Sequence, residues 1–151
     1  MVYTRRRGTA IVETPDGIVL VSVDGETFTL PGGGAKPKES ERDAAARELM
    51  EETGMKARSL TFLFSFMGLL HKGTRGGYFR NSHKVFLVMA SGTPRPGQEI
   101  TKVAYYKGSG VKLSQSAQKI IAKYRSGAWS RATSKSSPPG PAPRLSRRPP
   151  P

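Results

Sequence analysis

The fold of this chain is decided by one stretch, residues 33–55, which reads GGAKPKESERDAAARELMEETGM. Its second half has the signals of a helix. Ser40 stands at an N-cap position with Asp43 three residues later, as in a capping box, and Gly54 is placed to end the helix. Residues 44–50 between these signals are good helix formers. We therefore expect a helix that begins at Ser40 and stops before Gly54.

The expected helix gathers negative charge on one face. At about 100° per residue, Glu48, Glu51 and Glu52 share a face roughly 100° wide, with the apolar stripe on another side. Carboxylates this close repel one another by roughly several tenths of a kcal/mol per pair unless a cation compensates. Hard oxygen ligands suit Mg²⁺ or Mn²⁺, and magnesium shares its coordination shell with substrate phosphates. The alternative is a solvated acidic face neutralised by Arg47.

The loop before the helix favours an ion site over that alternative. A short apolar strand, residues 27–30, ends in Pro31 and three glycines. Glycines allow the backbone to turn carbonyls toward a cation or amides toward a phosphate. Connections between strands and helices often carry glycine, however, so the loop alone does not identify the site.

Loop and helix together resemble a known signature. Gly33, five residues, Glu39, seven residues and then residues 47–55 reproduce G-x(5)-E-x(7)-R-E-U-x-E-E-x-G-U, the Nudix box, in which U is a bulky aliphatic residue. Seven fixed residues at typical frequencies of about 5–7% recur by chance roughly once in 10⁸–10⁹ positions. The chain therefore resembles the Nudix hydrolases. The resemblance implies a mixed α/β (α+β) fold, an α/β/α sandwich with a mixed sheet and the acidic box helix.

The same resemblance implies a reaction and a metal site. Nudix enzymes hydrolyse a nucleoside diphosphate linked to another moiety, using divalent metal bound by the box. The implied ligands of Mg²⁺ or Mn²⁺ are the carboxylates of Glu48, Glu51 and Glu52 and the carbonyl of Gly32. Such metals neutralise pyrophosphate charge and lower the pKa of a bound water.

Other residues of the pattern have supporting roles. Arg47 is expected to orient the acidic side chains through a pair with Glu39, while Gly33 and Gly54 support the box. Glu99 is the single acidic residue after the box. In some family members a downstream carboxylate completes metal binding or acts as the general base, which implies such a role for Glu99. The alternative is that Glu99 merely opens a strand as a solvated residue.

Substrate contacts are predicted from residue type alone. The aromatic rings of Phe28 and Tyr78 are candidates for stacking on a base, and Arg80 and Lys84 are our preferred phosphate contacts. The glycine-rich segment 73–77 is expected to form a loop over the site.

The remaining elements are expected from apolar patterning and turn signals. A Pro-Asp-Gly turn joins two strands into a hairpin, and a second helix has Ser114 as its N-cap. The expected strands are 8–13, 18–23, 27–30, 60–66, 84–90 and 102–106, and the second helix covers 113–124.

Charge is distributed unevenly along the 151 residues, whose formal net charge is +14. Residues 1–52 carry 7 basic and 10 acidic side chains, whereas residues 53–151 carry 18 basic and 1 acidic. A metal would offset the acidic cluster and leave a site suited to a small polyphosphate, so the expected partner is a nucleotide.

The division of the chain follows from composition. Residues 131–151 hold seven of the twelve prolines and five basic residues, which predicts a disordered basic tail with at most weak binding of nucleic acid. Residues 1–130 are then the Nudix domain. The alternative is that residues 131–151 have no function.

Other classes of function are excluded by what the sequence lacks. With no cysteine there is no disulfide framework, thiolate metal site or cysteine nucleophile. The two histidines, His71 and His83, lack metal-ligand spacing and are expected in core or surface positions. No stretch reads as a membrane span or signal peptide. We expect a soluble cytoplasmic protein, a monomer or homodimer without a membrane partner.

The leading functional hypothesis is a metal-dependent, MutT-like pyrophosphohydrolase of a (d)NTP or modified NTP. A second enzymatic reading replaces this substrate with ADP-ribose or a dinucleoside polyphosphate. A third, from another class, is an RNA-binding or RNA 5′-end-processing module on the same fold.

Overall fold

A mixed four-stranded sheet forms the centre of the molecule. This computed structural model describes residues 2–127 and 129 of the chain. The strand order is β5-β1-β7-β6, with β1 (Val2–Ile11) and β7 (Tyr78–Ser91) parallel in the middle. The two outer strands, β5 (Gly32–Gly34) and β6 (Lys56–Lys72), run antiparallel to their neighbours.

Smaller sheets extend this centre. The Pro-Asp-Gly turn joins β2 (Glu13–Thr14) to β3 (Gly17–Ser22), and β3 also pairs with β8 (Lys102–Tyr106). A parallel two-stranded sheet joins β4 (Thr27–Phe28) to β9 (Lys112–Leu113). The predicted turn and the strand 102–106 are therefore confirmed.

The acidic helix has the predicted ends. It is α1 (Glu41–Thr53), and the Ser40 side chain accepts a hydrogen bond of 3.0 Å from the Asp43 backbone N–H. Gly54 closes the helix with φ 76°, a left-handed conformation that glycine adopts without steric cost. The second helix, α2 (Gln115–Ser126), is capped by Ser114 in the same way.

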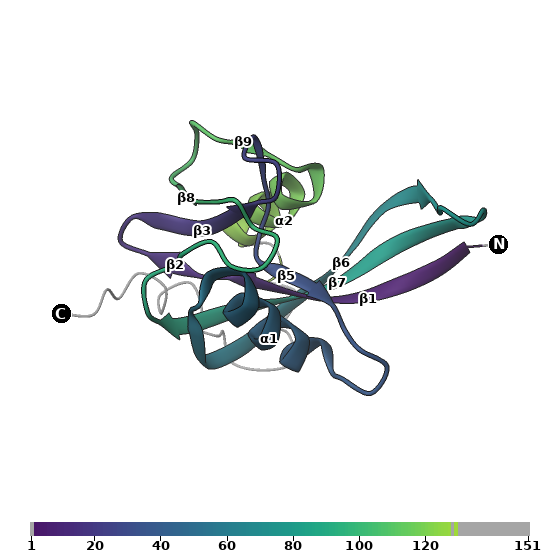
Figure 1. Ribbon diagram of the computed structural model, residues 1–151, viewed down its shortest axis with the longest axis horizontal. Coiled ribbons are helices and arrows are strands. Elements are labelled where there is room, and N and C mark those ends of the chain that lie inside the picture. Colours follow the sequence, from purple (N-terminus) through teal and green to yellow (C-terminus); the bar gives the residue numbers. More distant parts are fainter. Residues whose placement is uncertain (1, 128, 130–151) are drawn as a thin grey trace.

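The two helices cover opposite faces of the central sheet (Figure 1). On one face α1 packs Ala45 and Leu49 against Phe86 and Val88 of β7. On the other, α2 packs over a second apolar cluster that contains Ile11, Val85, Leu87, Ile120 and Ile121. The predicted mixed α/β sandwich with a mixed sheet is thus confirmed.

Close packing at one glycine fixes the position of the acidic helix. A Cβ atom on Gly8 of β1 would collide with the Glu41 carbonyl and the Ala45 amide of α1. Because only glycine leaves this space, the first turn of α1 lies directly against β1. The helix therefore projects its acidic residues past the β5 edge of the sheet.

Three strands continue beyond the helices as a projecting arm (Figure 1). We define the β-arm as residues 2–6 of β1, 67–72 of β6 and 78–82 of β7, with the connecting turn 73–77. The predictions for these strands were too short, because their outer halves are stabilised by pairing between distant segments and not by local apolar patterning. The turn 73–77 lies at the tip of the β-arm, away from α1 (Figure 1).

No helix in the described part of the chain is long and apolar enough to cross a membrane. The predicted tail, 131–151, lies outside the described residues, and the division at residue 130 stays a prediction.

Candidate active site

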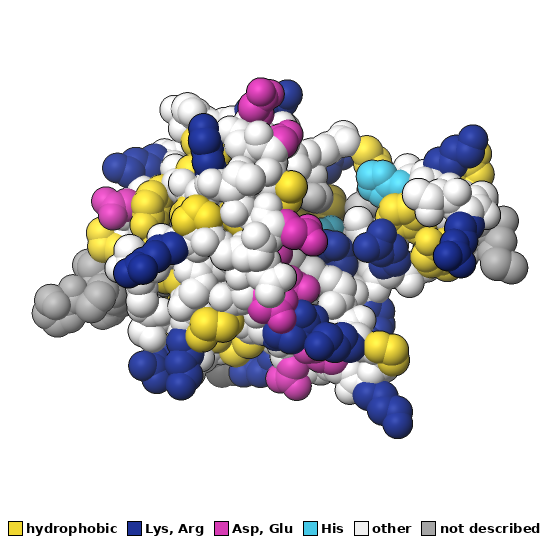
Figure 2. Space-filling view, in the orientation of Figure 1, with side chains coloured by type: hydrophobic (Ala, Val, Ile, Leu, Met, Phe, Trp, Pro, Cys, Tyr) yellow, Lys and Arg dark blue, Asp and Glu magenta, His cyan; other side chains and the backbone are white. Residues whose placement is uncertain are grey.

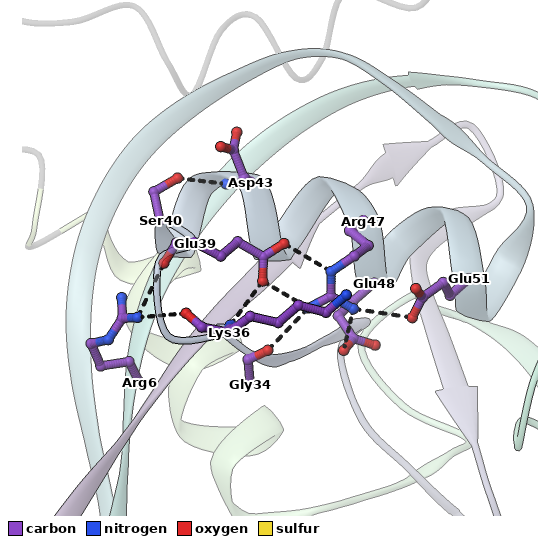
Figure 3. A network of polar contacts seen from close by, with 9 residues as sticks. All are labelled: Arg6, Gly34, Lys36, Glu39, Ser40, Asp43, Arg47, Glu48 and Glu51. Carbon is purple, nitrogen blue, oxygen red and sulfur yellow. Dashed lines mark hydrogen bonds and ion pairs between the residues drawn. The ribbon is translucent and has the colours of Figure 1, made fainter.

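Arg47 is the centre of a polar network on α1 (Figure 3). Its Nε donates to Glu39 at 2.8 Å and one terminal nitrogen donates to the other Glu39 oxygen at 2.9 Å, so the pair is bidentate. The same guanidinium donates to Glu48 and Glu51, each at 3.2 Å, and to the Gly34 carbonyl at 3.1 Å. One side chain thus connects the glycine loop, the residue before the helix and two of the clustered carboxylates.

This network shifts the pKa of its members. The Arg47 hydrogen bonds, followed by the hydrogen bond from the Lys36 backbone N–H, lower the pKa of Glu39 to about 2. Glu39 in turn is the largest cause of a raised Arg47 pKa. Both groups therefore remain charged across the physiological range.

Glu52 lies in a different environment from its neighbours. Its carboxylate accepts a hydrogen bond of 3.1 Å from the Gly32 backbone N–H. Burial raises the pKa of Glu52 to about 8, the Gly32 bond opposes that rise, and the charge of nearby Glu48 adds to it. Two carboxylates in such proximity are costly unless a positive charge joins them.

The acidic residues border one polar cavity of about 320 Å³. Glu48, Glu51 and Glu52 line it from α1, and Glu99 lines it from the segment before β8. That segment is tied to the end of α1, because the Gly97 backbone N–H donates to the Glu52 carbonyl at 3.0 Å. The structure thus brings Glu99 to the same cavity as the box carboxylates, although 47 positions separate it from Glu52 in the sequence.

A partly buried arginine completes this cavity. Arg7 of β1 lines it, and its side chain reaches the Gly32 carbonyl at 3.5 Å. Its Nε is buried and has no hydrogen-bond partner within the described residues. Burial lowers the pKa of Arg7 and nearby Arg5 adds to that shift, while the two acids Glu52 and Glu48 oppose it. An unpaired donor on a buried cation is costly, which favours an anionic ligand at this point.

A second cavity, of about 340 Å³ and mostly apolar, lies between β6, β7 and the first turn of α2. Phe66, His71 and Asn81 line it, together with His83. His83 is buried, and its Nδ1 lies 2.8 Å from the Thr9 hydroxyl. Burial lowers the pKa of His83 to about 4, with a further contribution from the charge of Arg7. The ring is therefore neutral at physiological pH.

The two cavities meet at one pair of residues. Arg7, which lines the polar cavity, is the register partner of His83, which lines the apolar one. Paired residues of adjacent strands point to the same face of a sheet. The cavities therefore open on one face and are separated by the width of a single residue pair.

The donors at the polar cavity are oxygen atoms of the kind that bind a hard metal ion. In the described residues no three acidic or histidine side chains are already gathered around one point, because Glu48 and Glu51 lie against Arg47. The donor set still fits a hard divalent cation, since three carboxylates and the Gly32 carbonyl border one cavity. A Cβ on Gly33 would collide with the Glu48 carboxylate, so this glycine leaves the space in which the acid lies.

Four residues predicted as substrate contacts line neither of these cavities. Lys84 lies 4.0 Å from Glu41, on the α1 side of the sheet, and Arg80 is exposed on the β-arm. Tyr78 is also exposed there, and Phe28 packs against the core beneath α2.

Sequence reasoning did not single out the Arg7–His83 pair. Arg7 is one of three consecutive arginines, and His83 was expected only as a core or surface residue. The strand register distinguishes them, and the alternation of β1 alone, with Arg7 two residues before the buried Thr9, is the signal that was present.

Clustered carboxylates and a partly buried arginine at one polar cavity are suited to metal-assisted hydrolysis of phosphoric anhydrides. The model of the NUDIX domain matches residues 3–123. The chain therefore belongs to the Nudix family, and it is a Nudix hydrolase acting on pyrophosphate bonds of a nucleotide-type substrate. Members of this family typically use a divalent metal.

Solved structures agree with this assignment. A Nudix hydrolase family member of Chromobacterium violaceum is 31% identical, with a TM-score of 0.70, and the match covers 95% of this chain and 90% of that one. A MutT Nudix hydrolase of Burkholderia pseudomallei is 20% identical with a TM-score of 0.64, covering 79% and 96%. A pyrophosphohydrolase of Bacillus subtilis is 17% identical with a TM-score of 0.59, covering 83% and 84%. No protein of curated function matches the chain.

Proposed function

We propose that this Nudix hydrolase is a MutT-like pyrophosphohydrolase that cleaves a (d)NTP or modified NTP to the nucleoside monophosphate and pyrophosphate. The proposal rests on the surroundings of Arg7. Its side chain is partly buried with a buried, unpartnered Nε, and it lies where a polar cavity meets an apolar one. That arrangement suits a ligand with phosphates at one end and an aromatic base at the other.

The polar cavity is proposed to hold the phosphates. Glu48, Glu51, Glu52 and the Gly32 carbonyl would hold Mg²⁺ or Mn²⁺, which would supply charge neutralisation and a water of lowered pKa. Arg47 holds two of these carboxylates in place before binding and retains Glu39 as its bidentate partner when they turn inward.

Arg7 and Glu99 are proposed to act from opposite sides of the same cavity. Arg7 donates hydrogen bonds to a phosphate oxygen, which satisfies its buried Nε. Glu99 is exposed at the rim, where a carboxylate can accept a proton from the attacking water or complete metal binding. Substituting Glu99 with Gln separates these roles from that of a solvated bystander, because only a bystander leaves kcat unchanged.

The apolar cavity is proposed to hold the nucleoside. Its volume of about 340 Å³ lies within the range typical of small-molecule sites. Phe66 offers an apolar surface, while Asn81 and the Ser114 region at the α2 N-terminus offer polar groups for base edges. Because His83 is neutral there, it adds no positive charge beside the base.

The test is a panel of nucleoside diphosphate derivatives with Mg²⁺ and analysis of the products. We expect a nucleoside triphosphate to be the best substrate and pyrophosphate to be released. Faster cleavage of ADP-ribose or a dinucleoside polyphosphate, or release of orthophosphate alone, would reject the proposal while leaving the family assignment intact.

Arg7 provides a sharper test of the binding mode. Arg7→Lys keeps the charge but loses the planar donor set, so we expect KM for the triphosphate to rise about tenfold or more. The matched control is Arg80→Lys, which changes an arginine that lines neither cavity and should leave KM unchanged. Equal effects of the two substitutions would contradict the proposed contact.

A further inference from the structure

One face of the β-arm carries a column of stacked rings. Phe79 lies at its centre, with the Tyr3 ring at 5.7 Å and 28° on one side and the His71 ring at 5.1 Å and 26° on the other. These residues come from three adjacent strands and are register neighbours, because Tyr3 pairs with Phe79 and Phe79 pairs with His71. Tyr3 is 50% exposed, so the column is a surface feature and not part of the core.

Positive charge accompanies the column. The Arg5 guanidinium lies over the Phe79 ring at 4.9 Å from its centroid. The β-arm and its turn contain five basic residues and no acidic one: Arg5, Arg6, Lys72, Arg75 and Arg80. Of these, Arg6 alone has a carboxylate within 4.0 Å among the described residues. Figure 2 shows the consequence, since lysine, arginine, histidine and apolar side chains gather on the projecting arm and no acidic side chain is visible there.

We propose that this face of the β-arm binds single-stranded nucleic acid. Bases would stack on the Tyr3 and His71 rings at the two ends of the column, which Phe79 holds in place, and Arg5 would contact the phosphodiester backbone. Every base has a flat π-face, so such a platform is tolerant of sequence. Positive charge without compensating acids favours the polyanion and makes its binding depend on salt.

The surface favours a single strand over other occupants. A duplex hides its base faces in the stack and would leave the aromatic column without a partner. A second copy docking the same face would bring two acid-free basic surfaces together, which is unfavourable. Base stacking and phosphate contacts do not involve the 2′-hydroxyl, so RNA and DNA single strands are expected to bind alike.

This inference goes beyond the proposed hydrolase function. Arg5, Tyr3 and Phe79 line neither cavity, and His71, at the other end of the column, is the one member that also borders the apolar cavity. Binding on the arm therefore needs neither the metal nor the box carboxylates. The two functions can be measured independently, and either can fail alone.

The experiment measures fluorescence anisotropy of a short labelled oligoadenylate with a 5′-hydroxyl end, in EDTA, against the full chain. Tyr3→Ala, Arg5→Ala and Phe79→Ala should each weaken binding about tenfold or more. Tyr78→Ala and Arg80→Ala are matched controls, because they remove an aromatic ring and an arginine from the opposite face of the same strand. These controls should change affinity by no more than about twofold to threefold.

Further measurements identify which ligand the β-arm binds. We expect a matched DNA strand to bind like RNA, a duplex to bind more weakly, and affinity to fall steeply as salt increases. Tyr3 is exposed near the end of its strand, so Tyr3→Ala tests the proposal even if Phe79→Ala unfolds the arm. Unchanged hydrolysis of a nucleoside triphosphate by Tyr3→Ala would show that the arm acts separately from the active site.

Three results would overturn the inference. One is equal loss of affinity in the two sets of variants, which would mean that charge alone attracts the strand. Another is tighter binding of duplex than of single strands. A third is a change from dimer to monomer in Tyr3→Ala with unchanged affinity for the oligonucleotide, which would make the face an interface between copies of this chain.

Discussion

The box end of the central sheet and the β-arm contrast in how they manage charge. At the box, Arg47 binds three carboxylates and a backbone carbonyl within one network. On the β-arm, basic residues accumulate with no acidic residue among them. A single sheet thus carries a region whose charges are mostly satisfied internally and another whose charges are left for a partner.

This difference distinguishes charged residues that hold the structure together from charged residues that remain available to bind a ligand. Arg47 is pinned by its neighbours, so its first role is to position them. Arg7 stands between the two regions, partly buried and with a buried, unpaired Nε. Whether the donors of an arginine are already hydrogen-bonded within the protein, more than its charge, distinguishes a structural residue from a ligand-binding one.

The largest effect is expected from the box carboxylate that Arg47 does not hold. Glu52→Gln keeps the shape of the side chain and removes its charge, so turnover should fall on the order of a thousandfold. The fold should persist, because burial already disfavours the charged form of Glu52, whose pKa is raised to about 8. Steady-state kinetics at saturating Mg²⁺ and thermal unfolding measure the two effects. Retention of most activity would remove Glu52 from the metal site.

Arginines in the two regions should differ sharply in stability. Arg47→Ala leaves Glu39, Glu48 and Glu51 without their shared cation, and we expect a loss of about 2 kcal/mol in unfolding free energy. Arg80→Ala on the β-arm should change it by less than about 0.5 kcal/mol. Urea unfolding of both variants makes the comparison. A similar loss in each would mean that the arm is also held together by its charges.

A pH-dependent effect is expected from His83, which lies where the two regions meet. Its folded pKa of about 4 is below the ordinary value of 6.5, so the unfolded chain binds the proton first as pH falls. The stability associated with neutral His83 is complete above pH 6.5 and declines toward pH 4, by roughly 2–3 kcal/mol. His83→Gln should remove this decline.

The measurement is the difference in unfolding free energy between wild type and His83→Gln at several pH values without metal. Taking the difference matters because Glu52, with its raised pKa, gains folded stability as pH falls from 8 and so opposes the histidine. A difference that stays constant between pH 6.5 and 4.5 would contradict burial of the neutral ring.

The smallest effect is expected from removal of residues 131–151. Truncation after Ser130 should leave nucleotide hydrolysis within about twofold of the full chain. Trp129 sets the limit, because it is buried, with its ring stacked on Tyr124 at 6.4 Å and tilted against Phe64 at 6.2 Å. Trp129→Ala should therefore destabilise the fold by about 3 kcal/mol in the same unfolding assay. A collapse of activity on truncation would show that residues 131–151 contribute to the site.

Local signals made one part of the molecule predictable. The α1 boundaries follow from Ser40 and Gly54, whose capping roles depend on neighbours only a few residues away. The shared face of Glu48, Glu51 and Glu52 follows from helical geometry alone. These features placed the box before any tertiary contact was known.

Features that depend on strand register could not be predicted as well from the sequence. Residues 2–6 lack a strand pattern of their own and become β1 by pairing with β7. The cavity at Asn81 and His83 likewise requires α2, from the far end of the domain, to lie over that face. Arg80 and Lys84 were predicted as phosphate contacts from residue type alone. Residue type carries no information on which face of β7 each residue occupies.

The parallel pairing at the centre of the sheet also has a consequence for synthesis. Val2 pairs with Tyr78 and Ile11 with Leu87, so every contact in this ladder spans 76 positions. As the chain emerges from the ribosome, α1 is synthesised before β7. The apolar side chain of Leu49 therefore cannot pack against Phe86 and Val88 until β7 has been made. The Arg47 network is local and can assemble early, whereas Arg7 meets His83 only when the ladder closes. The two-cavity site is therefore expected to form late, after β7 has paired with β1 and α2 has covered the same face of the sheet.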